Sequence, residues 1–264
     1  MKWLVFSRNR PYQLDAFLST AKKNAGISPQ DIFVLYKYDD EYLECLDTLM
    51  KEHEGCTFLE ETDFRKQVLD WVSESNEFVS FATDDALFTR AFNSDVIEGT
   101  LRNNPAVLLF SLRLGLHLDW CYPTNSLQKV PDGQVNFGVF AWNFRSAEAD
   151  WGYPLSVDGH VFRKDQLLSM VSAIDFKNPN TLEANLQAWM RAELPPAACC
   201  FMKSSYFNSP LNVVQSVYLN RSGNTSVEKL KKDFEMKKRF DTDLCKNFVN
   251  VSAHQEFELM EKSE

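Results

Sequence analysis

Two adjacent acidic residues directly follow a short run of strand-forming residues. The run Phe78–Phe81 leads through Ala82 into Thr83, Asp84 and Asp85. Two carboxylates at the end of a buried strand repel each other and lose hydration, so a nearby positive charge must compensate. They can hold a hard divalent cation such as Mg²⁺ or Mn²⁺ through their oxygens. Alternatively, they can cap a following helix and interact with its dipole, and the residues alone favour neither role.

The elements that must position these acids alternate along the first part of the chain. Strands are expected at Lys2–Phe6, Asp31–Tyr36, Cys56–Leu59, Phe78–Phe81 and Ala106–Leu112, and helices at Arg10–Asn24, Glu41–Lys51, Asp63–Ser73 and Ala86–Thr100. Strands that are apolar on both faces and alternate with helices predict an α/β fold with a mostly parallel sheet covered on both sides. Ligands bind beyond the carboxyl ends of such strands, which is where the two aspartates stand.

The pattern changes in the second half of the chain. Aromatic and turn residues crowd together from Asp119 to Gly159, which predicts short antiparallel strands and loops over a cleft. Helices are expected at Val161–Ala173 and Thr181–Glu193, a strand at Val213–Tyr218, and a charged helical tail from Ser226.

Composition limits the classes of function. The 264 residues are 44% hydrophobic and include 21 Phe, which is enough to build a core. A net charge of −9 argues against nucleic acid as a partner. The six cysteines contain no CxxC pair, so a zinc site or disulfide framework is not expected. No signal peptide or membrane-spanning run is recognisable, so we expect a soluble cytoplasmic protein, with membrane docking of its basic tail left open.

The order of these segments resembles the nucleotide-sugar glycosyltransferases of the GT-A fold. The resemblance rests on the apolar strand that ends in TDD after the first strand–helix units, and on the later segments YPLSVDGH and NPNTLE. It implies a Rossmann-like GT-A domain over residues 1–215, with a nucleotide-sugar-binding half (1–118) and an acceptor and catalytic half (119–215). A helical extension, residues 216–264, would pack on the same domain.

The resemblance implies a DxD-type site at the aspartate pair. Asp85 would bind Mn²⁺ or Mg²⁺, together with Asp84, while Thr83 and Asp84 lie near the ribose or the sugar of the donor. Thr83 replaces the first acid of the family signature, which departs from the usual pattern. A histidine late in the chain often serves as a further metal ligand in this family, and His254 lies at such a position, far downstream of the aspartate pair. His160 could instead contact the acceptor or the diphosphate.

Further donor contacts are expected from two loops. The loop after the first strand consists of Ser7, Arg8, Asn9, Arg10 and Pro11. Its backbone N–H groups and guanidinium groups could contact a uracil edge or a phosphate, although charged loops are often simply solvated. After the second strand, the resemblance implies that Tyr38 stacks on the base and Asp40 accepts from it. A helix cap by Asp39 or Asp40 is the simpler explanation.

Two more positions complete the expected donor and sugar contacts. Arg65 could reach a phosphate, although an exposed helix face explains it more simply. Gly138, in the segment Asn136–Gly138, resembles the small-residue loop that lets a sugar approach the backbone. The rings of Trp142, Trp151 and Tyr153 could pack against sugars, or could only line the wall of the cleft.

Two acids compete for the role of general base. Transfer with inversion needs a carboxylate that takes the proton from the attacking acceptor hydroxyl. Asp158 lies in the loop SVDGH, where an Asp-Gly turn is the alternative explanation. Glu183 follows Asn180 at the spacing of a helix capping box, which would explain it without catalysis. We favour Asp158 as the base, with Glu183 second.

These expectations combine into one function and two alternatives. The favoured function is metal-dependent transfer of a sugar from a nucleotide-sugar donor, with UDP-sugar expected, to a saccharide acceptor with inversion. A module that binds nucleotide sugars without catalysis is the first alternative, and Thr83 would suit it. A nucleotidyltransferase is the second, although the loop SRNRP lacks the glycine- and lysine-rich pattern of a phosphate-binding loop.

Overall fold

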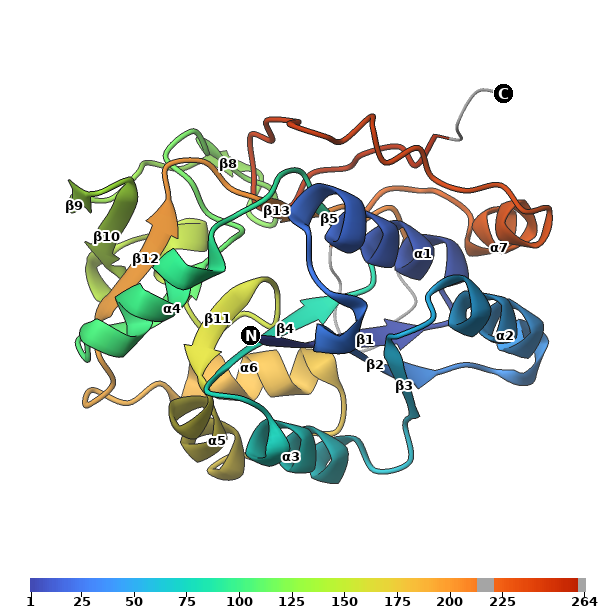
Figure 1. The fold of residues 1–264 in the computed structure, drawn as a ribbon. Helices are drawn as coiled ribbons and strands as arrows, with labels where there is room; N and C mark the ends of the chain where they lie inside the picture. The colour runs from blue at the N-terminus through green and yellow to red at the C-terminus, as the bar shows by residue number, and fades with distance from the viewer. Residues whose placement is uncertain (213–220, 261–264) are drawn as a thin grey trace.

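A nine-stranded sheet forms the centre of the protein. The computed structural model describes residues 1–212 and 221–260 (Figure 1). Along the sheet the order is β3 (Thr57–Glu60), β2 (Ile32–Lys37), β1 (Lys2–Arg8), β4 (Phe78–Thr83), β11 (His160–Arg163), β6 (Val107–Ser111), β12 (Ala197–Phe201), β10 (Val139–Asn143) and β9 (Gly133–Asn136). β3, β2, β1 and β4 pair in parallel, as do β6 and β12, whereas β11 and β10 run against their neighbours. The sheet is therefore mostly parallel, as the sequence predicted.

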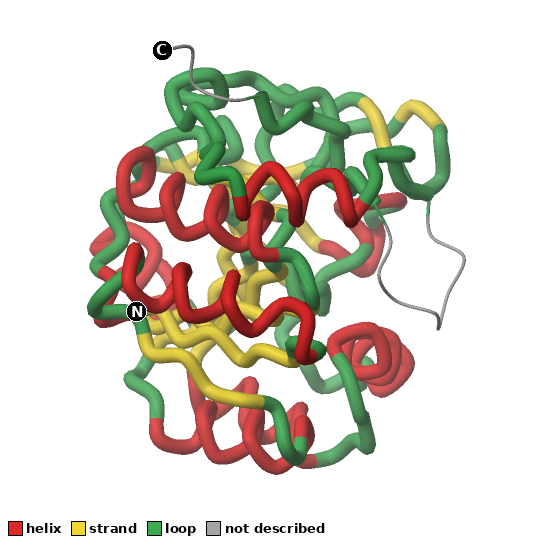
Figure 2. Tube along the Cα trace, turned by 90° about the vertical axis from the view of Figure 1, so that its right-hand side faces the viewer, coloured by secondary structure: helices red, strands yellow, loops and turns green. Residues whose placement is uncertain are grey.

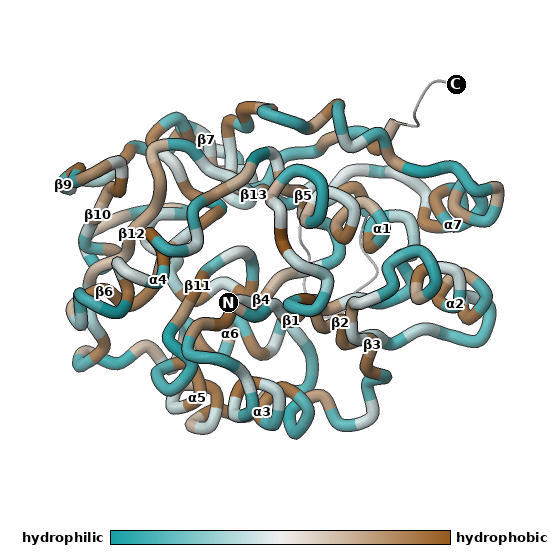
Figure 3. Tube along the Cα trace, viewed as in Figure 1, coloured by the Kyte–Doolittle hydropathy of each residue, from teal (hydrophilic) through white to brown (hydrophobic). Residues whose placement is uncertain are grey.

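Alternate residues of the central strands face two separate cores. On β1, Trp3 and Val5 belong to one buried cluster, while Leu4 and Phe6 belong to the other. This is why the strands are apolar on both faces, as expected for a sheet that helices cover on each side. Figure 3 shows hydrophobic positions along the central strands and along the helices that flank them.

Two layers of helices cover the sheet (Figure 2). One layer contributes Phe17, Leu49, Leu101 and Leu230 to the first core, and it consists of α1 (Pro11–Thr20), α2 (Leu43–Glu52), α4 (Ser94–Asn103) and α7 (Val227–Glu235). The other layer contributes Val68, Leu167 and Leu182 to the second core, and it consists of α3 (Phe64–Glu74), α5 (Lys164–Ser172) and α6 (Pro179–Trp189). The α/β architecture is thus confirmed.

The segment after the two aspartates is not the helix that the sequence predicted. Ala86–Phe88 forms β5, which pairs antiparallel with β13 (Tyr206–Asn208), and α4 begins only after Asn93. The side chain of Asn93 accepts hydrogen bonds from the backbone of Asp95 and Val96, which makes it the helix cap. The helix Ala86–Thr100 was wrong because a distant strand buries Ala86–Phe88. The capping role considered for Asp84 and Asp85 is therefore excluded.

The second half of the chain follows the sequence expectations only in part. The antiparallel pairs β9–β10 and β7 (Trp120–Cys121) with β8 (Ser126–Leu127) are confirmed, although β9 and β10 extend the main sheet. The helix expected from Val161 begins at Lys164, because β11 first fills the gap between β4 and β6. β12 was not predicted, and the strand expected at Val213–Tyr218 lies outside the described residues.

The tail is helical over a shorter range than expected. Beyond α7, residues 236–260 consist of turns, bends and loops. They run back across the body of the protein, where His254 pairs with Asn208 in an isolated parallel bridge. Phe248 and Phe257 pack with Phe207 of β13. The tail is therefore built into the same core as the sheet. No helix in residues 1–212 and 221–260 is long and apolar enough to cross a bilayer.

The turn at Gly159 offers a test of this packing. Gly159 has a φ of +65°, and a Cβ there would lie 2.8 Å from the ring of Tyr206. We expect Gly159→Ala to lower the unfolding free energy by about 2–4 kcal/mol, since backbone strain and a clash add together. Gly138 has a φ of +80° with open space around its Cα, so Gly138→Ala should cost only about 1 kcal/mol. Equal losses in urea denaturation would contradict the clash.

Candidate active site

Asp84 is buried at the carboxyl end of β4, and its carboxylate holds the first loop. Its Oδ2 accepts hydrogen bonds from the Ser7 hydroxyl at 2.9 Å and from the Arg8 backbone N–H at 3.2 Å. Its Oδ1 accepts from Nη1 of Arg10 at 3.0 Å. Three residues at the end of β1 and in the loop after it thus donate to one carboxylate, and the hydroxyl of Tyr38 lies 3.2 Å from that of Ser7.

The positive charge between the two aspartates is the guanidinium of Arg10. Its Nη1 lies 3.0 Å from Oδ1 of Asp84 and 3.1 Å from Oδ2 of Asp85, and its Nη2 donates to the carbonyl of Asn212 at 2.6 Å. Burial raises the pKa of Asp84 to about 6, an effect that Arg10 opposes. The ion pairs in turn raise the pKa of Arg10 despite its burial, so the guanidinium stays charged. Arg10 therefore compensates the repulsion within the aspartate pair.

Thr83 connects this pair to Asp158. The Thr83 hydroxyl lies 2.8 Å from Oδ1 of Asp85 and 2.7 Å from Oδ1 of Asp158, and it accepts from the amide of Asn208 at 2.9 Å. A hydroxyl has one proton, so it can donate to only one of the two carboxylates at a time. The first position of the TDD signature thus serves as a bridge between two acids.

Asp158 is buried, and no hydrogen bond to its Oδ2 comes from residues 1–212 or 221–260. Burial raises its pKa to about 6, opposed by Arg113 and reinforced by the charges of Glu183 and Asp85. Nε2 of His254 lies 4.0 Å from its Oδ2, which is too long for a hydrogen bond. A carboxylate with a pKa near neutrality and a free oxygen has the properties of a general base.

Glu183 has no such free oxygen. Its Oε2 accepts from the Ser156 hydroxyl and the Val157 N–H, both at 2.9 Å, and its Oε1 accepts from the Tyr153 hydroxyl at 3.1 Å. The capping box that the sequence suggested for it is wrong, because Asn178 and Thr181 form the box of α6. Glu183 instead holds the loop that leads into Asp158.

Of the two candidate histidines, His160 is buried, whereas the side chain of His254 is 23% exposed. Burial and the charge of Arg113 lower the pKa of His254 and of His160 well below the usual range. Nδ1 of His254 lies 3.2 Å from Nη2 of Arg113. Since arginine can only donate, Nδ1 must accept, and the ring proton then sits on Nε2. Within the described residues, neither ring nitrogen of His160 has a hydrogen-bond partner.

Several predicted donor residues lie elsewhere or have other partners. Asn9, with a φ of +52°, exchanges two hydrogen bonds with Asp39, whose side chain caps no helix. Asp40 is exposed in a 3₁₀ turn (Asp40–Tyr42), and Arg65 donates to the carbonyls of Ser172 and Ile174 at the end of α5. Gly138 lies in the exposed turn between β9 and β10, which explains its positive φ without a ligand.

Sequence reasoning missed Arg113 and Asn208. Arg113 stands alone among apolar residues in the segment FSLRLGL, directly after a predicted strand, and that isolation is a signal that could have identified it. Asn208 carries no such signal, because it reaches Thr83 only through the pairing of β13 with β5.

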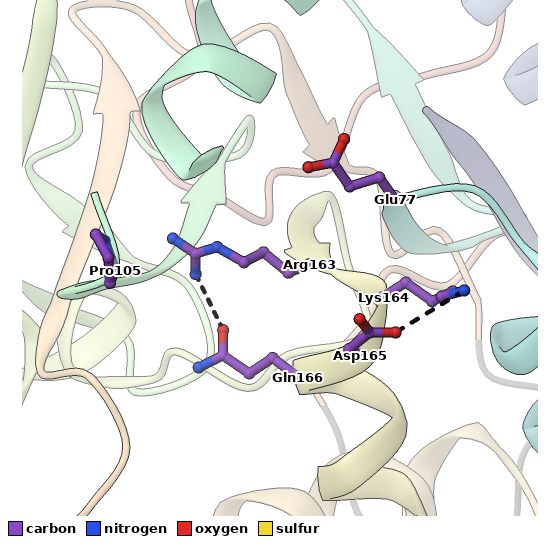
Figure 4. A pocket seen from close by; sticks show the side chains of 6 residues that line it. All are labelled: Glu77, Pro105, Arg163, Lys164, Asp165 and Gln166. Carbon is purple, nitrogen blue, oxygen red and sulfur yellow. Dashed lines mark hydrogen bonds and ion pairs between the residues drawn. The ribbon is translucent and has the colours of Figure 1, made fainter. Parts of the chain in front are cut away.

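A groove of about 400 Å³ lies at the amino ends of β4 and β6, on the side of the sheet away from the two aspartates. Figure 4 shows its lining residues, Glu77, Pro105, Arg163, Lys164, Asp165 and Gln166. Arg163 donates to Gln166 and to backbone carbonyls, and Lys164 lies 3.8 Å from Asp165. Within this groove Lys164 pairs with Asp165, while Glu77 pairs with Arg102 outside it, and the carboxylate of Asp165 is exposed to solvent rather than buried as that of Asp158 is.

The raised pKa of Asp158 predicts a stability effect. Its protonated form is favoured in the fold, so the stabilisation is complete below the unfolded pKa of about 4 and is lost as pH rises through about 6. We expect Asp158→Asn to be more stable than the wild type at pH 7.5, by about 1–3 kcal/mol, and equally stable at pH 4. Thermal unfolding at both pH values measures this, and a variant that is less stable at pH 7.5 would refute it.

Comparison with known proteins adds an independent finding. No known protein-family profile matches the chain. It is 25% identical over 254 residues to the bifunctional glycosyltransferase pgtA of Dictyostelium discoideum. The match covers 82% of this chain and 32% of the relative, so the chain spans about a third of that protein's length.

Among solved structures, S. aureus TarS is 14% identical, with a TM-score of 0.49, over 79% of this chain and 36% of that one. A TarS 1–349 complex with UDP has a TM-score of 0.46 at 14% identity, over 82% and 67% of the two chains. Over most of its length, therefore, the chain is similar in sequence to a named glycosyltransferase, in agreement with the resemblance that its own motifs show.

Proposed function

We propose that this chain transfers a sugar from a nucleotide-sugar donor, a UDP-sugar, to a hydroxyl of a saccharide acceptor with inversion. The observation that carries the proposal is the open Oδ2 of Asp158, next to an acidic corner at the carboxyl end of β4. The sequence similarity to a glycosyltransferase supports the class of reaction.

The charge of the corner supports a divalent cation as cofactor. The corner holds the carboxyl groups of Asp84, Asp85, Asp150, Asp158 and Glu183 and the guanidinium groups of Arg10 and Arg113. Carboxyl groups outnumber guanidinium groups by five to two, so a diphosphate would be repelled unless a cation accompanied it. Bound there, a divalent cation would neutralise the departing nucleoside diphosphate.

No group of three or more His, Cys, Asp or Glu side chains among the described residues could hold a metal ion, so we place the cation between Asp85 and the diphosphate of the donor. The side chain of Asp85 is 17% exposed, whereas that of Asp84 is 4% exposed, although each accepts three hydrogen bonds. The amide oxygen of Asn208 is buried beside Asp85 and has no hydrogen-bond partner among the described residues. We therefore propose Asp85 and Asn208 as oxygen ligands. We leave His254 out, because Nδ1 accepts from Arg113 and Nε2 carries the proton.

The reaction assigns separate roles to the remaining acids. Asp158 takes the proton of the acceptor hydroxyl, whose oxygen bonds to the anomeric carbon. The bond from that carbon to the diphosphate oxygen breaks, and its electron pair leaves with the diphosphate through an oxocarbenium-like transition state. Glu183 orients the loop of Asp158 and takes no proton, because three donors already occupy its oxygens.

A binding module without catalysis is the alternative from another class. The two functions differ in hydrolysis of the donor, because many transferases slowly cleave a nucleotide sugar to which no acceptor is offered, whereas a pure binder does not. Thermal-shift screening of nucleotide sugars with and without Mn²⁺ identifies the donor, since ligands of the native state raise its melting temperature. A UDP-sugar that binds with Mn²⁺ but is never cleaved would favour the binding module.

The role of the base is tested by two isosteric substitutions. We expect Asp158→Asn to lower kcat for transfer by about 10²–10⁴-fold while the donor affinity stays unchanged, since only proton removal is lost. Glu183→Gln keeps an acceptor oxygen for the loop, so its kcat should fall by less than about tenfold. Steady-state kinetics and calorimetry with the donor measure both. Full activity in Asp158→Asn would exclude it as the base.

The cation site is tested by Asp85→Asn. This variant keeps the hydrogen bonds from Thr83 and Asn208 but loses the charge. We expect calorimetric affinity for UDP in the presence of Mn²⁺ to fall at least about tenfold, which is about 1.4 kcal/mol. Asp165→Asn, at the exposed acid of the opposite groove, is the control and should bind as the wild type does. Unchanged affinity in Asp85→Asn would remove it from the site.

A further inference from the structure

Arg113 joins three distant segments beside the base. It follows β6, its side chain is only 4% exposed, and its two terminal nitrogens have three partners. Nη1 donates to the Ser156 hydroxyl at 2.7 Å, while Nη2 lies 3.3 Å from Oδ1 of Asp150 and 3.2 Å from Nδ1 of His254. A planar guanidinium can make such contacts simultaneously, because its donors have a fixed fork geometry.

The contact with Ser156 extends to both candidate bases. The Ser156 hydroxyl donates to Oε2 of Glu183 at 2.9 Å and accepts from the backbone N–H of Asp158 at 3.3 Å. With Arg113 as its second donor, this hydroxyl is fully used. The orientation of the turn that carries Asp158 therefore depends on a hydrogen-bond chain that starts at Arg113.

The contact with Asp150 keeps Arg113 in place. Oδ2 of Asp150 accepts from the amide of Gln128 at 3.2 Å, and the backbone N–H of Asp150 donates to the amide oxygen of Gln128 at 3.2 Å. Asp150 is therefore fixed before it meets the guanidinium. Asp150 therefore restricts movement of the buried Arg113 guanidinium. The position of the guanidinium in turn determines where the loop of Ser156 and Asp158 lies.

The contact with His254 brings the tail into the site. Neighbouring residues of the tail are tied to the body, because the carbonyl of Ala253 accepts from the backbone of Asn208 and that of Val251 accepts from the backbone of Trp120. Arg113 fixes the ring tautomer of His254, so the Nε2 proton faces Oδ2 of Asp158 across 4.0 Å. The side of Asp158 that is open to an acceptor is thus bordered by the tail.

We infer that Arg113 is a positioning residue that holds the loop of Asp158 and the tail segment of His254 in one arrangement. The C-terminal segment then forms part of the surroundings of the base. The kinetic test of this inference rests on the proposed function, because it measures the proposed transfer. The spectroscopic test does not, because it measures only the tautomer of His254.

The kinetic test uses Arg113→Met, which keeps the length of the side chain and removes its donors. We expect kcat to fall at least tenfold while KM for the donor changes less than about threefold, since Asp85 and the first loop are untouched. Arg113→Lys, which keeps the charge but has a single ammonium group, should recover part of kcat. Loss of donor affinity in parallel with kcat, or full kcat in Arg113→Met, would overturn the inference.

Arg163→Met is the matched control. Arg163 also donates to several acceptors, the carbonyls of Leu101, Asn104 and Val107, but at the opposite edge of the sheet. This variant should be less stable than the wild type and keep the wild-type kcat of its folded fraction. If it loses kcat as Arg113→Met does, general destabilisation explains both and the inference fails.

The spectroscopic test does not need turnover. The chain has four histidines, so ¹⁵N labelling of their rings gives few signals to assign. We expect His254 to carry its proton on Nε2 in the wild type and to lose this preference in Arg113→Met. Suppose that the wild-type protein shows this tautomer but neither cleaves nor transfers any donor. The proposed function would then be wrong, whereas the inference about Arg113 would hold. The Nδ1–H tautomer in the wild type would refute the inference alone.

Discussion

The site depends on one buried guanidinium between two carboxylates. Without Arg10, Asp84 and Asp85 would lie side by side in a region almost closed to water, where unpaired charges cost several kcal/mol each. The pairing also fixes positions, because Arg10 immediately precedes α1 while the aspartates end β4. The same contacts that oppose the repulsion between the acids therefore hold the first loop against the carboxyl end of the sheet, where ligands of such folds bind.

From this pair the hydrogen bonds lead to acids with different roles. Asp84 and Glu183 each accept three hydrogen bonds and act as supports. Asp85 keeps partial exposure, and Oδ2 of Asp158 accepts no hydrogen bond from the part of the chain that the structure describes. Asp85 also accepts three hydrogen bonds, from Arg10, Thr83 and Asn208, so its exposure, not the number of its donors, distinguishes it from Asp84. Thr83, which looks like a lost ligand in the signature, links Asp85 with Asp158 instead.

Much of the sheet could be predicted because its signals are local. Trp3, Leu4, Val5 and Phe6 are apolar in an unbroken run, which indicates a strand with both faces covered. The place of Asp84 and Asp85 followed from the same pattern. The sequence also predicts that their partner Arg10 lies in the first loop. Its orientation depends on a hydrogen bond to the distant Asn212, which local patterns do not contain.

The missed features are pairings between distant residues. Ala86–Phe88 has no local mark of a strand until Tyr206–Asn208 pairs with it, so an apolar helix was the natural reading. Arg113, Ser156 and His254 meet only after three segments have folded together. A single sequence shows hydrophobic periodicity and composition, and neither property identifies which distant residues contact each other.

The central claim is that the acidic corner of Asp85, Asn208 and Asp158 receives the donor diphosphate with a divalent cation. The most direct measurement is anomalous scattering from manganese in crystals grown with Mn²⁺ and UDP. The account predicts one strong peak beside Asp85, in contact with the diphosphate. UDP bound at this corner without a manganese peak, or manganese and UDP together at the groove of Glu77 and Asp165, would contradict it.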